Sequence, residues 1–503
     1  MCVYPEVATL SGYEASVAQF TELLVRLGSA EHQHADLATA EAMLQRDGVK
    51  VFRQVLEDWT RLRSEAEPVR AVLGSDSVER THHRSAHREV ESTFGTIHFA
   101  RDRASARGVD GLAPVDAVLN LPDDRFTFAA RERLVLEAIR GSFDEAAAVV
   151  RQTTGAAVVK RQTEEVVRAA AIDFEAFYSQ APPANDVKTM DKLLVLSADG
   201  KGIVMRSEGL REQTRRNAEA SSHKLEKRLS KGEKGNRKRM ATVAAVYDLA
   251  LVPRTVDDVL VELDGQMRTP RPKAENKRVW ASITRSSREI IAEMFAEAER
   301  RDPRHECIWV VLVDGNLAQI RQIRAEASRR GVRVSLVLNL IHAIEYLWDA
   351  AWDFFAEGEP VAGVWVTGHL RNLLEGKPKQ VAASIRRAAT NQQLQRRKNV
   401  DKAANYFHNH ASMMQYDQSL SAGFPIATGV IEGACRHLVK DRMDITGARW
   451  GLEGAEAILR LRSLHASGDL QDYWAFHQRR EFERNHLSRY ANQEHGWLIQ
   501  EAA

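Results

Sequence analysis

The sequence predicts a multidomain protein of mixed α and β structure, in which a five-stranded mixed sheet with a helical insertion follows a mostly helical N-terminal region. Three observations predict this class. The chain has 503 residues, more than one ordinary domain contains. Two short apolar runs that each end in an aspartate have the length of buried strands. Long segments around them carry apolar residues at spacings of three and four, the periodicity of amphipathic helices.

The composition restricts the class of protein further. Apolar residues make up 44% of the chain, which is enough for hydrophobic cores, and the formal net charge of +2 does not by itself indicate a nucleic-acid partner. The three cysteines, Cys2, Cys307 and Cys435, are far apart and show no metal-ligand spacing. The sequence has no run of about 18 apolar residues and no signal-peptide pattern. We therefore expect a soluble, cytoplasmic protein without structural disulfides and without a membrane partner.

The first region, residues 1–125, is predicted to be helical with one short β-hairpin. From residue 13 to about residue 80, apolar residues recur at helical spacing. Over Val90–Arg101 the pattern changes, and β-prone residues on both sides of Gly95 predict two short strands.

Residues 126–185 have the outline of a helix-turn-helix. A helix over 144–151, with Ser142 or Asp144 as its N-cap, is followed by a turn that ends at Gly155 and by a second helix. This outline is typical of DNA-binding modules, although any pair of antiparallel helices shares it. The second helix begins with two basic residues that are expected to contact DNA: Lys160 and Arg161.

Five strands are expected in the central part of the chain, at residues 193–198, 203–205, 242–251, 308–313 and 332–338. Three strands joined by hairpin-like turns, then strand, helix, strand and a final helix, is the order of a ribonuclease-H-type sheet. In that fold the first and fourth strands are parallel neighbours. Because Asp199 ends the first and Asp314 the fourth, the two carboxylates are expected side by side, which suits divalent metal binding and phosphoryl transfer.

A third acidic residue, Glu432, is the best candidate to complete such a site, because two-metal phosphoryl transfer normally uses a further carboxylate. The segment 430–443 has apolar residues along one side. Along the other side, Glu432, Arg436 and Lys440 follow one another at intervals of four. The alternative interpretation is an exposed Glu–Arg pair that contributes only about 0.3–0.5 kcal/mol to helix stability.

A basic stretch, Arg206 to Arg239, has 12 Lys and Arg residues against 5 Glu. Such a stretch suits contact with DNA phosphates, and a solvated charged helix and loop is the alternative. The basic residues expected to contact DNA, with those of the 430–443 segment, are Arg215, Arg216, Lys227, Arg228, Arg237, Lys238, Arg436 and Lys440.

A set of short motifs extends over residues 85–465. The longest is the segment 423–436, followed by Arg442-Met443 and Gly447–Trp450. The others are Pro114–Pro122, Ser197–Gly200, Arg301–Pro303, Leu312–Gly315, and His342 with Glu345–Trp348. In this order the motifs resemble those of bacterial insertion-sequence transposases of the ISKra group.

The resemblance implies a ribonuclease-H-like fold and a DDE triad formed by Asp199, Asp314 and Glu432, which holds two Mg²⁺ or Mn²⁺ ions. It implies a transposase that binds double-stranded DNA, both the terminal inverted repeats of the element and the target, and that cleaves and joins strands. Because two DNA ends must be joined, at least a dimer is expected on DNA, and the expected location is the nucleoid of a bacterial cytoplasm. The residues expected to line the site are Asn316, Asn339 and His342.

The sequence departs from this group in two places. Asn339 stands where an aspartate is expected at the end of the fifth strand. The cysteine pair of a small N-terminal zinc ribbon is absent, since no cysteine lies between Cys2 and Cys307. His82, His83 and His87 could replace those ligands, but surface histidines are the preferred interpretation. Two other functions stay open: a catalytically inactive, transposase-derived DNA-binding protein, which Asn339 favours, and a structure-selective nuclease on the same fold.

The predicted elements and the resemblance together divide the chain into six parts. These are the N-terminal region (1–125), the helix-turn-helix region (126–185), the first part of the catalytic core (186–345), the helical insertion (346–424), the final helix of the core (425–466) and a C-terminal tail (467–503).

Overall fold

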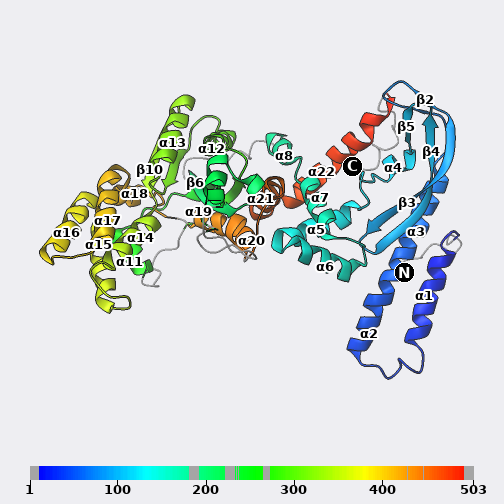
Figure 1. Cartoon of the computed structure of the whole chain (residues 1–503), viewed down its shortest axis with the longest axis horizontal. Helices are drawn as coiled ribbons and strands as arrows, with labels where there is room; N and C mark the ends of the chain where they lie inside the picture. Colours follow the sequence, from blue (N-terminus) through cyan, green and yellow to red (C-terminus); the bar gives the residue numbers. More distant parts are fainter. Residues whose placement is uncertain are drawn as a thin grey trace, which may run out of the picture. The chain divides into compact units, whose positions relative to one another are not determined.

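The computed structural model describes residues 11–180, 192–220, 233, 235, 237–263, 272–427, 429–445 and 447–491. The chain forms two compact units (Figure 1). The first unit combines the two ends of the chain, Met1–Ser179 and Leu470–Ala503, and the second is the continuous segment Gln180–Asp469. In the described ranges, no helix has the length and apolar character needed to cross a membrane.

The first unit begins with helices and a long β-hairpin. The helices are α1 (Glu14–Leu27), α2 (Leu37–Met43) and α3 (Val49–Ala66). The strands are β1 (Val72–Leu73), β2 (Glu79–Arg80), β3 (His82–Ser92), β4 (Gly95–Ala106) and β5 (Val109–Leu112). The hairpin predicted around Gly95 is confirmed and is longer than expected, because β3 and β4 pair along their whole length. The helical prediction up to residue 80 is wrong after Ala66, where the short β1–β2 pair begins.

After these strands, the N-terminal segment of this unit continues with five helices: α4 (Pro114–Val118), α5 (Phe128–Arg140), α6 (Phe143–Thr154), α7 (Lys160–Ala170) and α8 (Phe174–Gln180). Ser142 is the N-cap of α6, and its side chain forms a reciprocal capping box with Glu145. Gly155 ends α6 with a φ of 72°, a left-handed conformation that glycine adopts without steric cost. Helix, glycine turn and basic-starting helix are therefore present as the sequence predicts.

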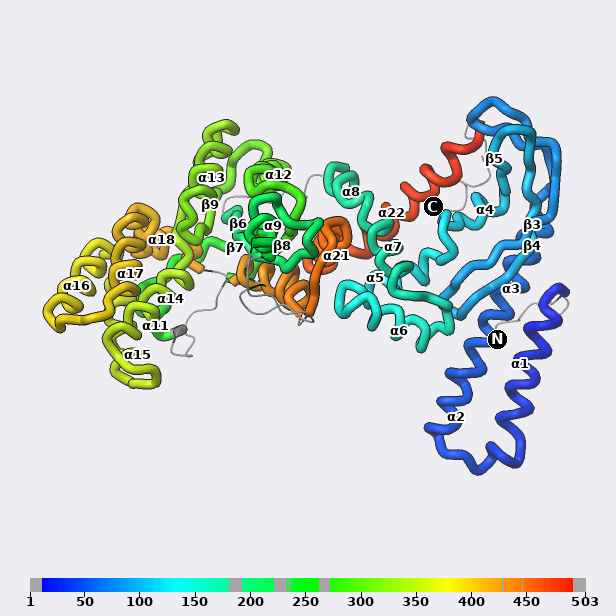
Figure 2. The backbone as a smooth tube through the Cα atoms, viewed as in Figure 1, coloured from blue at the N-terminus to red at the C-terminus, as the bar shows by residue number. Residues whose placement is uncertain are grey.

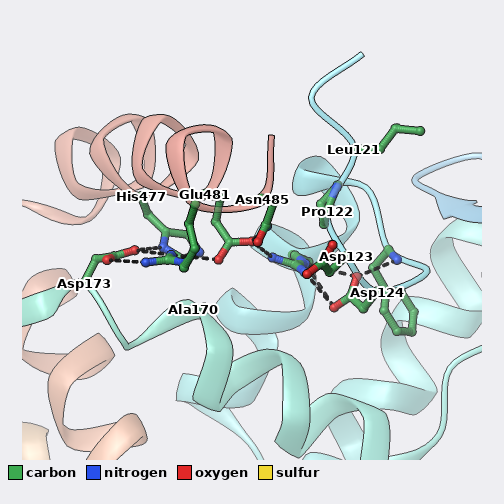
Figure 3. A network of polar contacts seen from close by, with 12 residues as sticks. Leu121, Pro122, Asp123, Asp124, Ala170, Asp173, His477, Glu481 and Asn485 are labelled. Atoms are coloured by element: carbon green, nitrogen blue, oxygen red, sulfur yellow. Dashed lines mark hydrogen bonds and ion pairs between the residues drawn. The ribbon is translucent and has the colours of Figure 1, made fainter. Parts of the chain in front are cut away.

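A further helix from the far end of the chain belongs to this unit. The sequence treats residues 467–503 as a tail, whereas α22 (Leu470–Asn485) packs on α5, α7 and α8. Its Tyr473 hydroxyl donates to the carbonyl oxygen of Ala170 (2.6 Å), and its Glu481 pairs with Arg131 of α5 (3.2 Å). Figure 3 shows the polar side chains of α22 pointing toward those of the N-terminal helices.

The second unit contains a five-stranded sheet in the order β10-β9-β6-β7-β8. Its strands are β6 (Lys192–Val204), β7 (Lys238–Ala250), β8 (Glu275–Ser282), β9 (Ile308–Val313) and β10 (Val334–Leu338). The strands β6, β7 and β8 are antiparallel neighbours, and β9 runs parallel to both β6 and β10. The prediction that the first and fourth strands are parallel neighbours is confirmed.

Two strand predictions are wrong. The strand expected at 203–205 is the end of β6, which continues through Gly200 and Gly202 instead of turning. A methyl group on Gly202 would lie 2.9 Å from Cδ of Lys238 on β7, so glycine serves the close approach of the two strands here. The third antiparallel strand is β8, which the sequence analysis did not identify because its first half is polar.

The helices of the second unit are α9 (Glu212–Ala220), α11 (Val256–Leu263), α12 (Ser287–Arg301), α13 (Leu317–Arg330), α14 (Leu340–Ala351), α15 (Pro360–Leu374), α16 (Pro378–Asn391), α17 (Lys398–Asn409), α18 (Tyr416–Ser421), α19 (Val430–Ala434), α20 (Asp441–Met443) and α21 (Leu452–Ser467). Between β10 and α19 the chain is helical, and Figure 2 shows α14 to α18 gathered on one side of the sheet. The segment from α19 to α20 packs against β6 and β7, and α21 packs against β8.

Candidate functional site

Asp199 and Asp314 come together where β9 ends beside β6. The parallel register pairs Ser197 of β6 with Leu312 of β9. Continuing this register by two residues sets Asp199 beside Asp314, on strands whose backbones lie about 4.8 Å apart. Asp199 was expected at the end of its strand, but it lies inside β6, which continues because β7 pairs with it along its whole length. The two carboxylates are half-buried.

Neutral donors hold these two carboxylates. Asp199 accepts hydrogen bonds from the Gly200 N–H (2.6 Å) and from the Cys435 thiol (3.2 Å), and Asp314 accepts one from the Asn316 N–H (2.8 Å). Burial, and then the negative charge of Asp199, raises the pKa of the Cys435 thiol, so this group stays protonated and can donate. Among the described residues, neither aspartate forms an ion pair with a Lys or Arg.

Glu432 comes from the segment that closes over this part of the sheet. The predicted helix over 430–443 is continuous, but its middle part, Cys435–Lys440, is π-helical, a variation that often marks functional sites. Ile431 and Leu438 are buried on the inner side, as the pattern predicts. Glu432 Oε1 accepts a hydrogen bond from the side-chain amide of Asn339 (2.5 Å). Glu432 Oε2 is shielded from solvent and has no hydrogen-bond partner in the described part of the chain.

Asn339 links Glu432 to the end of β9 and to the start of α14 through three hydrogen bonds. It is only 2% exposed. Its N–H donates to the carbonyl oxygen of Val313 at the end of β9 (2.8 Å), and its Oδ1 accepts from the Ile341 N–H, which caps α14 (3.0 Å). Its Nδ2 then holds Glu432. Asn339 therefore lies next to the acidic cluster as expected, and the amide supplies a donor that an aspartate would lack.

The other two residues expected to line the site have local roles. The Asn316 side chain caps α13 by accepting from the Ala318 N–H (3.0 Å), while its N–H holds Asp314. His342 is half-buried on α14 and pairs with Glu345 (Nδ1 to Oε2, 3.1 Å).

Three residues near the acids carry no signal in the sequence analysis. Tyr406 of α17 donates its hydroxyl hydrogen to the carbonyl oxygen of Asp314 (2.8 Å), and His410 Nε2 lies 3.0 Å from the carbonyl oxygen of Gly315. Lys201 follows Asp199 by two residues on β6, so it faces the same side of the sheet, and its charge lowers the pKa of the Cys435 thiol. Their relation to the acids depends on tertiary structure, so periodicity could not identify them.

The residues predicted to bind DNA are mostly at the surface. Lys160 pairs with Asp144 (2.5 Å) and Arg161 with Glu165 (2.9 Å), and the Arg161 side chain is 88% exposed. The α9 residues Arg215 and Arg216 pair with glutamates of the same helix.

The remaining basic residues divide into three groups. Lys227 and Arg228 lie outside the described residues. Lys238 and Lys440 are exposed, Arg237 is half-buried, and Arg436 is exposed and pairs with Asp441 (3.5 Å). The neighbouring Arg239 has a structural role, since it donates to the carbonyl oxygens of Ile283 (2.9 Å) and Gly209 (3.2 Å).

The acidic residues supply oxygen donors of the kind that divalent cations bind, but they form no closed site among the described residues. Within the described ranges, no three His, Cys, Asp or Glu side chains converge closely enough to hold one ion. Mg²⁺ keeps several waters and takes one or two protein carboxylates, so such a closed cluster is not required. The shielded, unpartnered Oε2 of Glu432 and the two aspartates without a basic partner are the donor atoms that such an ion needs. His83, by contrast, is hydrogen-bonded to Asp102 (2.7 Å), and His82 and His87 are exposed.

Comparisons with known proteins give no match, either to models of protein families or to curated sequences. The site is therefore interpreted from its own geometry and from the motifs described above.

Proposed function

We propose that this protein is a DDE transposase that binds the ends of an insertion sequence and catalyses metal-dependent cleavage and transfer of DNA strands. One observation carries the proposal: Asp199, Asp314 and Glu432 come from three distant parts of the chain and lie where β9 ends beside β6, with no basic partner among the described residues. The strand order β10-β9-β6-β7-β8 also supports a ribonuclease-H-like core, and the ordered motifs support membership of the ISKra group.

The carboxylates would hold two Mg²⁺ or Mn²⁺ ions, which supply the charge that activates the attacking oxygen and stabilises the leaving oxygen. Asp199 and Asp314 would hold one ion, and Asp199 and Glu432 the other. In the proposed cleavage, a water would lose a proton to solvent and its oxygen would bond to phosphorus as the P–O3′ bond breaks. The released 3′ oxygen would take up a proton, which gives a DNA 3′-hydroxyl. That hydroxyl attacks a target phosphate in the same way and displaces its 3′ oxygen. Lys201 faces the same side of β6 and is suited to contact the phosphate.

The remaining parts of the proposal concern DNA. The α6–α7 pair, with Lys160 and Arg161 at the start of α7, is the proposed reader of the terminal inverted repeats. The basic surface residues would contact phosphates without reading sequence. At least two copies would bring two ends together, on the nucleoid of a bacterial cytoplasm.

One observation bears on the main alternative, an inactive transposase-derived DNA-binding protein. Asn339 removes an expected carboxylate, but its amide donates to Glu432 (2.5 Å) and so orients an acid of the triad. A residue that orients the third carboxylate is consistent with an active site that does not need a fourth one.

The test is cleavage of duplex DNA with and without the terminal inverted repeats, in Mg²⁺ and in EDTA, by the full-length protein and by Asp199→Ala. Metal-dependent cleavage at the repeats that Asp199→Ala abolishes supports the proposal. Cleavage of both duplexes alike would support a nuclease instead, and selective binding without cleavage would support the inactive alternative. Asp349→Ala, an exposed acid on α14, is a matched control that should cleave normally.

A further inference from the structure

We propose that Tyr406, on the inserted helix α17, is a positioning residue for Asp314, so that the helical insertion completes the cation site of the sheet. This inference rests on the proposed function, because it assigns Tyr406 a role in binding the ion that Asp314 would hold. It adds a residue from a part of the chain that supplies no acid.

The insertion holds the turn after β9 by two consecutive carbonyl groups. The Tyr406 hydroxyl donates to the carbonyl oxygen of Asp314 (2.8 Å). His410 Nε2 lies 3.0 Å from the carbonyl oxygen of Gly315, within hydrogen-bond distance for the tautomer that carries a proton on this nitrogen. Two adjacent hydrogen bonds fix the orientation of the peptide planes on both sides of Gly315. Because the Asp314 side chain leaves the backbone at the first of these planes, the same contacts fix the direction of its Cα–Cβ bond, and the Asn316 N–H of the same turn then holds its carboxylate (2.8 Å).

Gly315 shows that the turn and the Tyr406 ring are matched to each other. Its φ is +92°, which side chains rarely tolerate. A methyl group on its α carbon would also lie 2.7 Å from Cε2 of Tyr406, much closer than a normal contact. The ring therefore packs directly on the turn backbone, and only glycine leaves room for it.

The ring itself is firmly held within the insertion. Tyr406 is 8% exposed and stacks on Tyr346 of α14, with ring centroids 3.9 Å apart and planes at 15°. The Lys402 ammonium lies 4.7 Å from the Tyr346 ring centroid, on an exposed part of α17.

Helix α14 links this support to the third acid. It begins at Asn339, whose amide holds Glu432, and it carries Tyr346, on which Tyr406 rests. Two of the three proposed metal ligands are thus held by residues of two helices that pack together: Glu432 by the N-cap residue of α14, and the backbone of Asp314 by α17. The third, Asp199, is fixed within β6, where it pairs with Val243 of β7, two residues beyond the last pair that β6 forms with β9.

The chain offers a matched control for a test of the Tyr406 hydroxyl. Tyr416, in the same insertion, is fully buried, and its hydroxyl has no hydrogen-bond partner among the described residues. Tyr406→Phe and Tyr416→Phe remove the same atom and keep the ring, so packing is preserved in both. Only the first change removes a hydrogen bond to the turn that carries Asp314.

The experiment measures Mn²⁺ binding to the full-length protein by calorimetry without DNA, and strand cleavage as a function of Mg²⁺ concentration. Tyr406→Phe should raise the Mn²⁺ Kd and the Mg²⁺ concentration for half-maximal cleavage about five- to tenfold, the effect of one hydrogen bond. Saturating Mg²⁺ should restore most of the cleavage rate, and DNA binding should not change. Tyr416→Phe should match the unmodified protein in every assay.

Two results would contradict the role of Tyr406: an unchanged Mn²⁺ Kd in Tyr406→Phe, or an equal loss in Tyr416→Phe. A different result would instead overturn the proposed function and this inference with it, namely an unmodified protein that binds no Mn²⁺ and shows no metal-dependent cleavage. The two failures are therefore distinguishable in one series of measurements.

Discussion

Each unit of this protein contains a cluster of buried or half-buried acidic residues. The negative charge of the first cluster is compensated by basic side chains, and that of the second is not. In the first unit, Asp173 accepts from His477 (2.7 Å) and Arg484 (3.0 Å), and Glu481 pairs with Arg484 (2.9 Å) and Arg131 (3.2 Å). Figure 3 shows these side chains in one continuous network between α22 and the N-terminal helices. Each acid in it has at least two partners of positive or donor character.

In the second unit, Asp199, Asp314 and Glu432 have no ion-pair partners among the described residues, unlike Glu297 of the same unit, which pairs with Arg278 and Arg300. Two backbone N–H groups, a thiol and a side-chain amide hold these three carboxylates, and one oxygen of Glu432 has no hydrogen-bond partner among the described residues. Neutral donors orient a carboxylate without cancelling its charge. The comparison teaches that burial of acids alone does not indicate a functional site. Buried acids whose charge is left uncompensated do indicate a functional site, because they do not contribute to the free energy of folding.

The largest expected effect comes from removing α22. A chain truncated after Asp469 would remove His477 and Arg484 from Asp173, and would leave Arg131 with Asp124 but without Glu481. It would also expose the surface that covers Tyr473, which is 0% exposed. The first unit should lose its cooperative unfolding transition in calorimetry, and DNA binding should be lost with it. A truncated chain with an unchanged transition would contradict the structural role of the network.

Asp314→Asn should abolish catalysis and leave folding intact. Cleavage should fall by at least about 10³-fold, equivalent to about 4 kcal/mol of transition-state stabilisation. The melting temperature should be unchanged or slightly higher, since the change relieves repulsion between neighbouring carboxylates. Parallel cleavage assays and thermal unfolding measure both quantities, and a clear loss of stability would place Asp314 with the structural acids instead.

Asp173→Ala should have the reverse pattern. Removing one partner of a buried ion pair costs about 3–5 kcal/mol, because the remaining charges stay buried and unpaired. Denaturant unfolding should show this loss in the first unit, while Mn²⁺ binding by the second unit should be unaffected. An Asp173→Ala protein that is fully stable but cannot bind Mn²⁺ would reverse the comparison.

The Asp173 network should also be sensitive to acid. Although burial raises the pKa of Asp173, its hydrogen bonds from His477 and Arg484 lower the pKa to about 2, from an ordinary value of 3.8. A carboxyl with a lowered folded-state pKa stabilises the protein above its ordinary pKa, and this contribution is lost as the pH falls from about 4 to about 2. Between about pH 4 and about pH 2, the free energy of unfolding of the first unit should fall more steeply with decreasing pH in the unmodified protein than in Asp173→Asn. Equal slopes would contradict the assignment.

The smallest expected effect is that of Asn339→Asp. The natural protein should be active, and the change should alter the cleavage rate or the preference between Mg²⁺ and Mn²⁺ by less than about tenfold, roughly 1.4 kcal/mol. The new carboxylate would lose the donor to Glu432, now 2.5 Å away, but would add a ligand for the ion. Metal titrations of both forms measure the difference. An inactive natural protein that Asn339→Asp restores would favour the inactive alternative.

Sequence patterns predicted the helices that bury one apolar face and the strands that are buried on both faces. The apolar runs before Asp199 and Asp314 are strands, and their parallel pairing follows from the predicted order. The patterns failed where glycines serve packing, as in β6, and where a helix buries polar residues. The inner side of α22 includes His477 and Glu481, so no apolar periodicity identified it as part of a core.

The sequence predicted the acidic residues of the candidate site, but it did not predict the residues that hold them in position. A strand-end aspartate stands out in sequence, but Tyr406 has the spacing of an ordinary buried residue of α17, like Val400 and Phe407. One quoted motif also has a structural explanation. Asp302 of Arg301–Pro303 accepts hydrogen bonds from the Cys307 N–H (2.9 Å) and from the indole of Trp309 (2.8 Å), which fixes the loop before β9.

The central claim is that the uncompensated acids of the second unit are a cation site, and Mn²⁺ binding to the full-length protein tests it most directly. Because Asp199 is shared between both proposed ions, Asp199→Asn should lose binding of both, whereas Asp173→Asn should bind as the unmodified protein does. Two ions per chain in the presence of DNA, lost only in Asp199→Asn, is the result that the structure predicts. Equal Mn²⁺ binding by the unmodified protein and Asp199→Asn would contradict it.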